Sequence, residues 1–277
     1  MSFIFSLFFF FCLPQVCLSS SALSPTPLTT KPLVEFVPHR AEYNIELHNV
    51  ERKGLVNDVK GTLSIELKKQ DNGWSFVQDS TMLVYFDDGH SEQYITKITS
   101  FESDDGHQYR FDVRSLRNGV NEELIQGHGY ITPSTLGSVT YTSPAQKNIT
   151  LPMGALFPLT HLRSVITAAV SGKTVFPDKI VFDGASDTQA EVDVNTIITP
   201  ATGPKLVVDK PDLLKVGKMW SLQMAIFSRG SKSPDPDYEI TQTSLESGVI
   251  ASMLMNYNEA GFTIKLTLNK VDLFTQS

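Results

Sequence analysis

The sequence predicts an all-β fold, in which many antiparallel strands form an open barrel or β-spiral, with one short amphipathic helix at about residues 161–171. Two observations predict it. Apolar and polar residues alternate with a period of two in segment after segment, and Gly-containing turn sequences separate these segments at short intervals. Strands joined in hairpins form a meander, and curling this meander into a barrel or spiral limits its exposed edges.

The strands of the N-terminal half are predicted from their alternation. After Ala41, apolar Tyr43, Ile45 and Leu47 alternate with polar residues, so that one face of the strand is apolar. Further strands are expected at Leu63–Leu67, Thr81–Phe86, Tyr94–Phe101 and His107–Val113. The turns carry Asp or Asn beside Gly, at Asp71-Asn72-Gly73, Asp87-Asp88-Gly89, Asp104-Asp105-Gly106, Asn118-Gly119 and Asp183-Gly184.

One segment in the middle of the chain breaks this pattern. Thr160 is a plausible N-cap, and the apolar residues after it follow the helical spacing i, i+3, i+4 and i+7, at Leu162, Val165, Ile166 and Ala169. Gly172 ends the helix. Its apolar stripe is expected to cover the mouth or open edge of the sheet. Strands then resume at Lys179–Phe182, Glu191–Ile198, Trp220–Phe227, Tyr238–Thr243, Val249–Tyr257 and Phe262–Leu268.

The N-terminus predicts export. The apolar run before the first charged residue, Lys31, is shorter than the roughly 20 residues that span a bilayer, but it suits a signal peptide. We expect a signal peptide at 1–22, a flexible proline-rich linker at 23–38 and a single β domain at 39–277. Both cysteines, Cys12 and Cys17, would leave with the signal peptide, so the mature protein would have no thiol. An uncleaved anchor, a buried N-terminal strand and lipidation at Cys17 are the alternatives.

Charge argues against a nucleic-acid partner, and hydropathy argues against a transmembrane span after the N-terminal segment. The formal net charge is −7, and an acidic surface repels phosphate backbones, so nucleic acid is not expected to bind. No later run is long and apolar enough for a transmembrane span in the mature chain.

Sequence motifs for catalysis or cofactor binding are weak. The acidic pairs Asp87-Asp88 and Asp104-Asp105 could ligate calcium, but hairpin turns explain both. No two of the six histidines have the spacing of a helical zinc site, although His90 and His107 could meet if their hairpins are neighbours. No nucleophile elbow occurs. We expect no cofactor, no metal and no enzymatic activity.

Aromatic residues crowd one region of the chain. Among them Trp74, Tyr85, Tyr109 and Phe111 are candidates for the lining of a groove that takes a hydrophobic ligand or partner segment. The alternative is that they fill the interior of the barrel.

Several motifs, taken in order, resemble the EipB family of alphaproteobacterial periplasmic proteins, a former domain of unknown function. These are Asn72-Gly73-Trp74, Ser103-Asp104-Asp105-Gly106, Tyr109-Arg110-Phe111, Gly127-His128-Gly129, the segment LPMGALFPLTH from Leu151 to His161, and Val181-Phe182-Asp183-Gly184. The resemblance runs roughly from Val37 to Leu268. It implies an open barrel or spiral of β-sheet, a role in envelope integrity under stress and no known enzyme activity.

The resemblance also implies a disulfide that this chain lacks. Family members generally tie the strand region before the Gly-Trp element to the C-terminal end of the chain. Here Asp71 stands where the first cysteine is expected, and no cysteine follows Cys17. Within the family-like segment, Leu151, Pro152, Gly154, Leu156, Phe157, Pro158 and His161 are candidates for a structural plug or a binding surface.

These observations together predict a periplasmic, non-enzymatic binding protein that contributes to envelope integrity and stress resistance. Its expected partner is another periplasmic or envelope protein, or else a hydrophobic ligand. Two alternatives stay open: a carrier of lipid or lipoprotein acyl chains in a half-open β-barrel, and a hydrolase acting on an envelope polymer.

Overall fold

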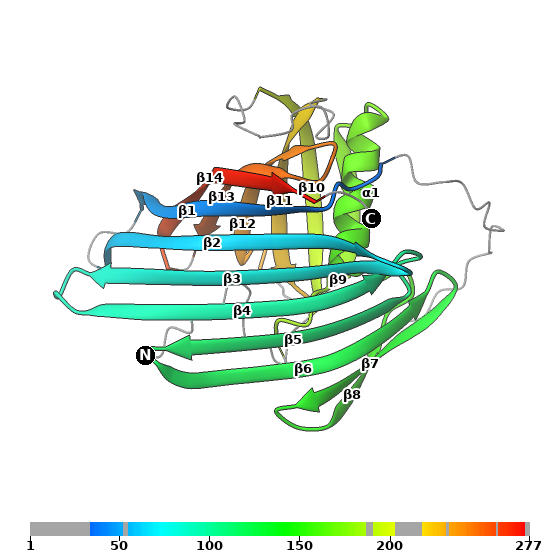
Figure 1. Ribbon diagram of the computed structural model, residues 1–277, viewed down its shortest axis with the longest axis horizontal. Coiled ribbons are helices and arrows are strands. Elements are labelled where there is room, and N and C mark those ends of the chain that lie inside the picture. The colour runs from blue at the N-terminus through cyan, green and yellow to red at the C-terminus, as the bar shows by residue number, and fades with distance from the viewer. Residues whose placement is uncertain are drawn as a thin grey trace.

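The computed structural model describes residues 34–51, 55–186, 191–202, 218–230, 233–258 and 260–274. They form a single sheet of fourteen antiparallel strands and one helix (Figure 1). The strands are β1 (His39–Val50), β2 (Val56–Gln70), β3 (Gly73–Phe86), β4 (Ser91–Ser103), β5 (Gln108–Arg117), β6 (Val120–Thr132), β7 (Thr135–Ser143), β8 (Lys147–Leu151), β9 (Val175–Phe182), β10 (Glu191–Ala201), β11 (Met219–Ser228), β12 (Tyr238–Leu245), β13 (Ile250–Tyr257) and β14 (Phe262–Leu273), and helix α1 spans Pro158–Val170.

The order of the strands makes the sheet an open spiral. It runs β8-β7-β6-β5-β4-β3-β2-β1-β14-β13-β12-β11-β10-β9, so two meanders meet where β1 pairs with β14. The two edge strands, β8 and β9, are consecutive in the chain, and α1 connects them. This architecture confirms the predicted fold class.

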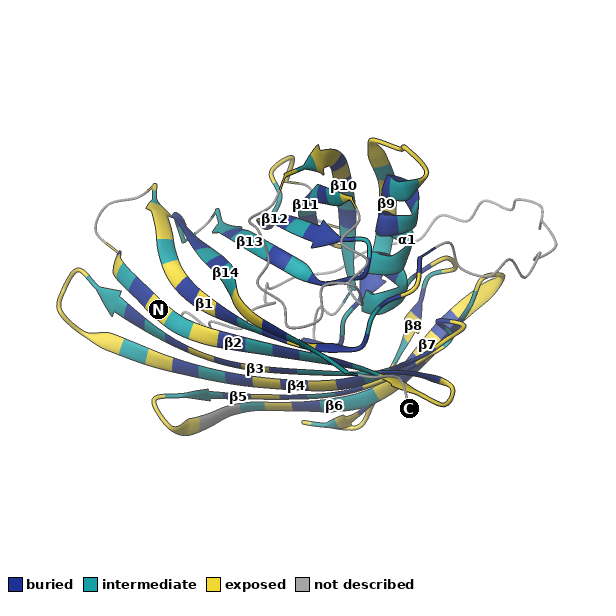
Figure 2. Cartoon of the chain, turned by 45° about the horizontal axis from the view of Figure 1, so that its top comes forward, coloured by how far each residue is buried: buried dark blue, intermediate teal, exposed yellow. Residues whose placement is uncertain are grey.

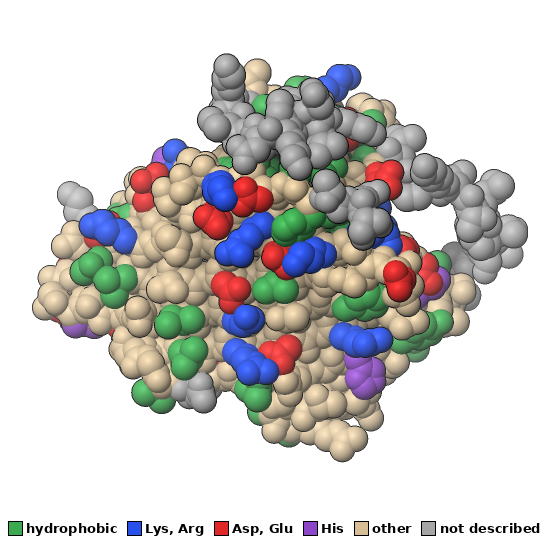
Figure 3. Space-filling view, in the orientation of Figure 1, with side chains coloured by type: hydrophobic (Ala, Val, Ile, Leu, Met, Phe, Trp, Pro, Cys, Tyr) green, Lys and Arg blue, Asp and Glu red, His purple; other side chains and the backbone are tan. Residues whose placement is uncertain are grey.

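Side chains alternate between an inner and an outer face, which Figure 2 shows as bands of buried and exposed residues along the strands. The buried apolar residues form three clusters, one of which packs the inner face of α1 against β2, β3, β10 and β11. Outer-face positions of β1 to β5 carry ion pairs such as Lys68–Glu66 (2.6 Å) and Arg114–Asp112 (2.9 Å). Figure 3 shows these acidic and basic side chains interspersed on this face.

Two predicted boundaries were wrong. The helix begins at Pro158 rather than about residue 161, because proline's fixed φ and missing N–H suit the first helical position, and Phe157 is the N-cap. The last residues of the predicted flexible linker, from Val34 to Pro38, pack on the domain, and Val34 and Phe36 are buried. Val34 and Phe36 are apolar and pack in the same cluster as the inner face of the helix, whereas Glu35 between them is exposed. The predicted signal peptide lies outside the described residues.

The alternation missed three strands, β6 to β8, between residues 113 and 151. Glycine stands at the inner positions Gly127 and Gly129 of β6 and Gly137 of β7, where an apolar residue would have marked the strand. The two histidines considered as a pair do not meet. His90 precedes β4 and His107 follows it, so the thirteen residues of β4 separate them.

Candidate functional site

The segment from Leu151 to His161 crosses between the two edges of the sheet. Leu151 ends β8, where it pairs with Gly137. Leu156 then forms a parallel bridge to β9: its N–H donates to the carbonyl of Ile180 (2.9 Å), and its carbonyl accepts from the N–H of Phe182 (3.0 Å). Leu156 therefore covers part of the edge of β9.

Phe157, which follows, lies at the centre of an aromatic cluster inside the spiral. Its ring is fully buried and stacks on Tyr109, with 5.0 Å between ring centroids. Phe111 and Phe182 belong to the same cluster, with ring centroids 5.6 Å apart, and the Tyr141 ring packs against both. The segment therefore closes one end of the spiral by filling it with side chains.

Two glycines of the family-like motifs give these rings their space. A Cβ on Gly129 would lie 3.1 Å from the Phe157 ring, and a Cβ on Gly184 would lie 2.7 Å from the Phe111 ring. The second distance is shorter than any real Cβ contact, and Gly184 also has a φ of +73°. The Gly-His-Gly and Phe-Asp-Gly motifs are thus explained by packing against aromatic rings.

The start of α1 is held by a carboxylate from a distant strand. Glu102, buried at the end of β4, accepts hydrogen bonds from the backbone N–H groups of Leu159 (2.9 Å) and Thr160 (2.7 Å), and from the Thr160 hydroxyl. The N-cap residue makes no side-chain cap bond, so Glu102 supplies the missing acceptor, and its charge suits the positive end of the helix dipole. Burial raises the pKa of the Glu102 carboxyl, and the hydrogen bonds from Thr160 and Leu159 oppose this shift.

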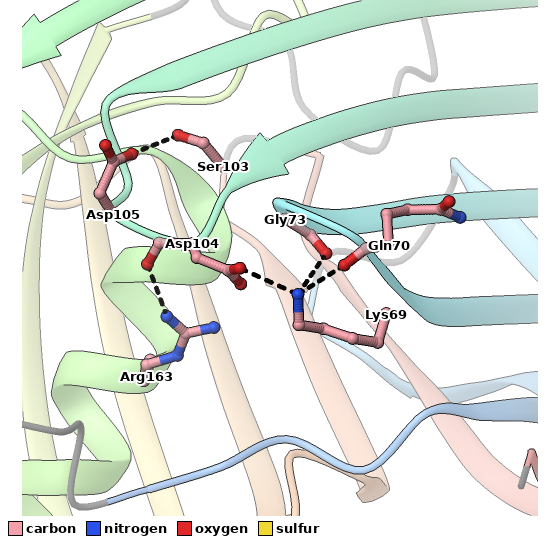
Figure 4. Close-up of polar contacts among 7 residues, drawn as sticks. All are labelled: Lys69, Gln70, Gly73, Ser103, Asp104, Asp105 and Arg163. Atoms are coloured by element: carbon pink, nitrogen blue, oxygen red, sulfur yellow. Dashed lines mark hydrogen bonds and ion pairs between the residues drawn. The ribbon is translucent and has the colours of Figure 1, made fainter. Parts of the chain in front are cut away.

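A second set of polar contacts ties two hairpin turns to the same helix (Figure 4). The ammonium group of Lys69 donates to Asp104 Oδ2 (2.9 Å) and to the carbonyls of Gln70 (2.6 Å) and Gly73 (3.3 Å). Arg163 of α1 reaches the carbonyl of Asp104 (3.4 Å). The acidic turn considered for calcium is therefore engaged by cations of the protein, and the described residues contain no group of three or more potential metal ligands.

The chain before β1 covers this end of the spiral. The Phe36 ring meets Trp74 edge-on, with centroids 6.1 Å apart, and the Arg163 guanidinium lies 5.2 Å from the Phe36 ring centroid. The N–H of Val37 donates to the carbonyl of Ser247 (3.0 Å). Trp74, a candidate for a groove lining, is therefore covered.

Two titratable groups lie beside the cluster. Burial, together with the positive charge of Lys179, lowers the pKa of His161 to about 4, and its Nε2 atom has no hydrogen-bond partner among the described residues. Burial raises the pKa of Asp183 to about 7. One carboxylate oxygen of Asp183 accepts the N–H of Ala185 (2.9 Å), and the Tyr109 hydroxyl donates to the Asp183 carbonyl (3.0 Å). The two hydrogen bonds of Asp183 hold the loop after β9.

The comparisons with known proteins decide the family. The sequence matches the EipB-like family over residues 30–275. The chain belongs to this family. The cell envelope integrity protein EipB of Brucella abortus (strain 2308) is 23% identical over 253 residues, which cover 87% of this chain and 85% of that protein. A crystal structure of a β-barrel-like protein of domain of unknown function DUF1849 from Brucella abortus has a TM-score of 0.76 at 21% identity, covering 87% of this chain and all of that one. The similarity to this crystal structure supports the open β-barrel-like fold described above.

In this EipB-like chain, the candidate aromatic residues divide between the two faces of the sheet. Trp74, Tyr109 and Phe111 are buried on the inner face. Tyr85 is on the outer face, where the Lys60 ammonium lies 5.7 Å from its ring centroid, so it cannot line an interior groove with the others. The period-two pattern places Tyr85 one residue out of phase with the inward-facing Val84 and Phe86.

Glu102 and Lys69 were not among the predicted site residues. A signal for Glu102 existed, because it continues the inward-facing series of Ile98 and Ser100 on β4, and a charged residue at such a position needs a buried partner. The identity of that partner, the N-terminus of α1, could not be read from the sequence.

The structure brings the C-terminal end of the described chain close to the strand that precedes Asp71, and these are the two regions that the family resemblance predicts to be joined by a disulfide. The Phe274 N–H donates to the carbonyl of Pro38 (3.0 Å), and the Lys68 ammonium lies 4.9 Å from the Phe274 ring centroid. Asp71 lies three residues after Lys68, in the turn between β2 and β3. Both cysteines of this chain lie outside the described residues.

Proposed function

We propose that this protein contributes to cell-envelope integrity from the periplasm, as a non-catalytic protein that binds another envelope protein. Membership of the EipB-like family supports the envelope role, since a relative of 23% identity is named for it. The predicted signal peptide at 1–22 supports the periplasmic location. Within the described residues, no helix has the length and apolar character needed to cross a membrane.

One observation carries the binding part of the proposal: apolar side chains are exposed beside the β8 edge of the sheet. Tyr130 on β6, Leu136 on β7 and Met153 after β8 are exposed to 51%, 66% and 56%. The pairing register places these side chains near one another. Tyr130 pairs with Ser138, two residues after Leu136 on the same strand. The residue next to Leu136, Gly137, pairs with Leu151 at the end of β8, two residues before Met153. Exposed apolar groups that gather in this way mark interaction sites.

The two edges of the sheet differ in their capacity to accept another strand. β9 is blocked, because Leu156 bridges to it and Pro177 within it has no N–H. β8 pairs with β7 on one side and with no other described strand. An extended segment of an envelope protein can therefore add to β8 through backbone hydrogen bonds and place apolar side chains on Leu136 and Met153.

Three polar groups in and around the family-like segment support a non-catalytic role. Glu102 holds the helix start, His161 is buried, and the carboxylate of Asp104 pairs with Lys69. Each of these groups has a structural contact or lies away from solvent, so none is placed as an acid or base beside a substrate.

The experiment is complementation of detergent resistance in cells from which the gene has been deleted. A Leu136→Asp/Met153→Asp variant should fail to restore resistance although it is exported and folds. Val120→Asp is the matched control, because Val120 is exposed to 68% at the far end of β6, and this variant should restore resistance. Full resistance with the double variant would refute the edge as the binding surface. Lipid copurifying in stoichiometric amount with the wild-type protein would support the carrier instead.

A further inference from the structure

A cleft lies on the other half of the sheet, away from β8. This cleft, of about 630 Å³, crosses the outer face of β10 to β14 and the end of β1. This volume falls within the range of about 300–1,000 Å³ that ligand sites occupy. From its lining we propose that this cleft binds a neutral oligosaccharide.

The pairing register sets most of the residues that line the cleft in two rows across the strands. In the first row, Asn195, Ala225, Glu239, Asn256, Thr263 and Asn49 are successive partners on six neighbouring strands. In the second row, Ile197, Gln223, Thr241 and Leu254 are partners on four strands. Neighbouring strands are about 4.8 Å apart, so side chains repeat along the cleft at nearly the length of one sugar ring.

The chemistry of the lining suits sugar hydroxyl groups. Four carboxamides line the cleft, at Asn49, Asn195, Gln223 and Asn256, and a carboxamide offers both a donor and an acceptor. Glu239 and His48 add an acceptor and a ring nitrogen. Among the described residues that line the cleft there is no lysine or arginine, so this lining offers no charge compensation to an anionic ligand.

Two further observations support a ligand in this cleft. Asn256 lines the cleft, and its buried Oδ1 atom has no hydrogen-bond partner among the described residues, so this wall of the cleft holds an unsatisfied acceptor. Ile197 is 51% exposed and, with Leu254 and Ala225, supplies apolar surface for the C–H face of a sugar ring. The cleft thus combines convergent polar groups with apolar contact, as ligand sites do.

Titration of the purified protein with chitotetraose and with cellotetraose, followed by calorimetry, tests the proposal. At least one of the two should bind saturably, and tetraalanine should not bind. Preference for chitotetraose would assign the site to acetamido sugars, whereas equal affinity would assign it to hydroxyl recognition alone.

Three variants make the test specific. Gln223→Ala should weaken binding at least fivefold, and Ala225→Trp should abolish it by filling the cleft. Gln93→Ala is the matched control, because Gln93 is an exposed carboxamide on the outer face of β4, and it should bind like the wild type. Absence of binding by both sugars, or equal weakening by Gln93→Ala and Gln223→Ala, would overturn the proposal. Gln223 is exposed, so its replacement should leave the core intact. Gln223→Ala therefore still tests the proposal if Ala225→Trp fails to fold. The assay is independent of the β8 edge and of the proposed envelope role.

Discussion

Replacing Glu102 by Ala should strongly destabilise the fold, because the start of α1 depends on this one carboxylate. The change removes the acceptor of three hydrogen bonds, from the N–H groups of Leu159 and Thr160 and from the Thr160 hydroxyl. It leaves these donors unpaired beside a buried cavity. The N-cap residue Phe157 has no side-chain oxygen that could replace the carboxylate.

The size of the effect follows from these contacts. A hydrogen bond to a charged group contributes about 1.5–3 kcal/mol, and breaking a buried charged contact by removing one partner costs about 3–5 kcal/mol. We therefore expect Glu102→Ala to lower the free energy of unfolding by about 3–5 kcal/mol. Glu102→Gln keeps one acceptor and the side-chain volume, so it should cost less than Glu102→Ala.

Urea unfolding followed by tryptophan fluorescence measures this difference, since Trp74 and Trp220 are both buried near the helix. Glu42→Ala is the control. Glu42 lies on the outer face of β1 and pairs with Arg40 at 3.5 Å in partly exposed positions, so its loss should cost at most about 1 kcal/mol. If Glu102→Ala costs no more than Glu42→Ala, the carboxylate does not hold the helix and the description of the site is wrong.

Three further outcomes follow from the same end of the spiral. Phe157→Ala should lower the free energy of unfolding by about 3–5 kcal/mol in urea, because the Phe157 ring is fully buried. An unchanged unfolding midpoint would instead indicate that the segment from Leu151 to His161 is a binding surface. Burial raises the pKa of Asp183 to about 7, so the wild type should lose stability as pH rises from about 4, the ordinary pKa of an aspartate, to about 7, and should change little above that. Asp183→Asn removes this titration and should gain stability relative to the wild type over the same range, whereas parallel profiles of unfolding free energy against pH would contradict this. Asp71→Cys with Phe274→Cys should form a disulfide that adds about 2–5 kcal/mol until reductant is added, whereas failure of the bond to form would show that the two regions do not meet.

The fold class could be predicted from the sequence because its signal is local. Tyr43, Ile45 and Leu47 point inward in the structure as their alternation requires, and the Asp- and Asn-containing turns close the hairpins β2–β3 to β5–β6. The alternation fails where glycine makes room for aromatic rings, as at Gly129, and there the strands were missed.

The candidate site was predictable only in part. The sequence singled out Leu156 and Phe157, and the structure places both between the two edge strands. The contacts that hold this segment come from distant parts of the sequence, and Glu102, which fixes the helix start, lies 57 positions before Leu159. No local pattern specifies such a pairing, because the register of β4 against the helix start is set by the curl of the whole sheet.

The proposed binding edge can be tested most directly by photo-crosslinking in living cells. A photoreactive residue at Thr150, exposed on β8, should crosslink to one envelope protein, and Leu136→Asp in the same chain should remove this product. The same photoreactive residue at Gln93, exposed on β4, should give no such product. Equal products from the two positions, or a product from Thr150 that survives Leu136→Asp, would contradict recognition at the β8 edge.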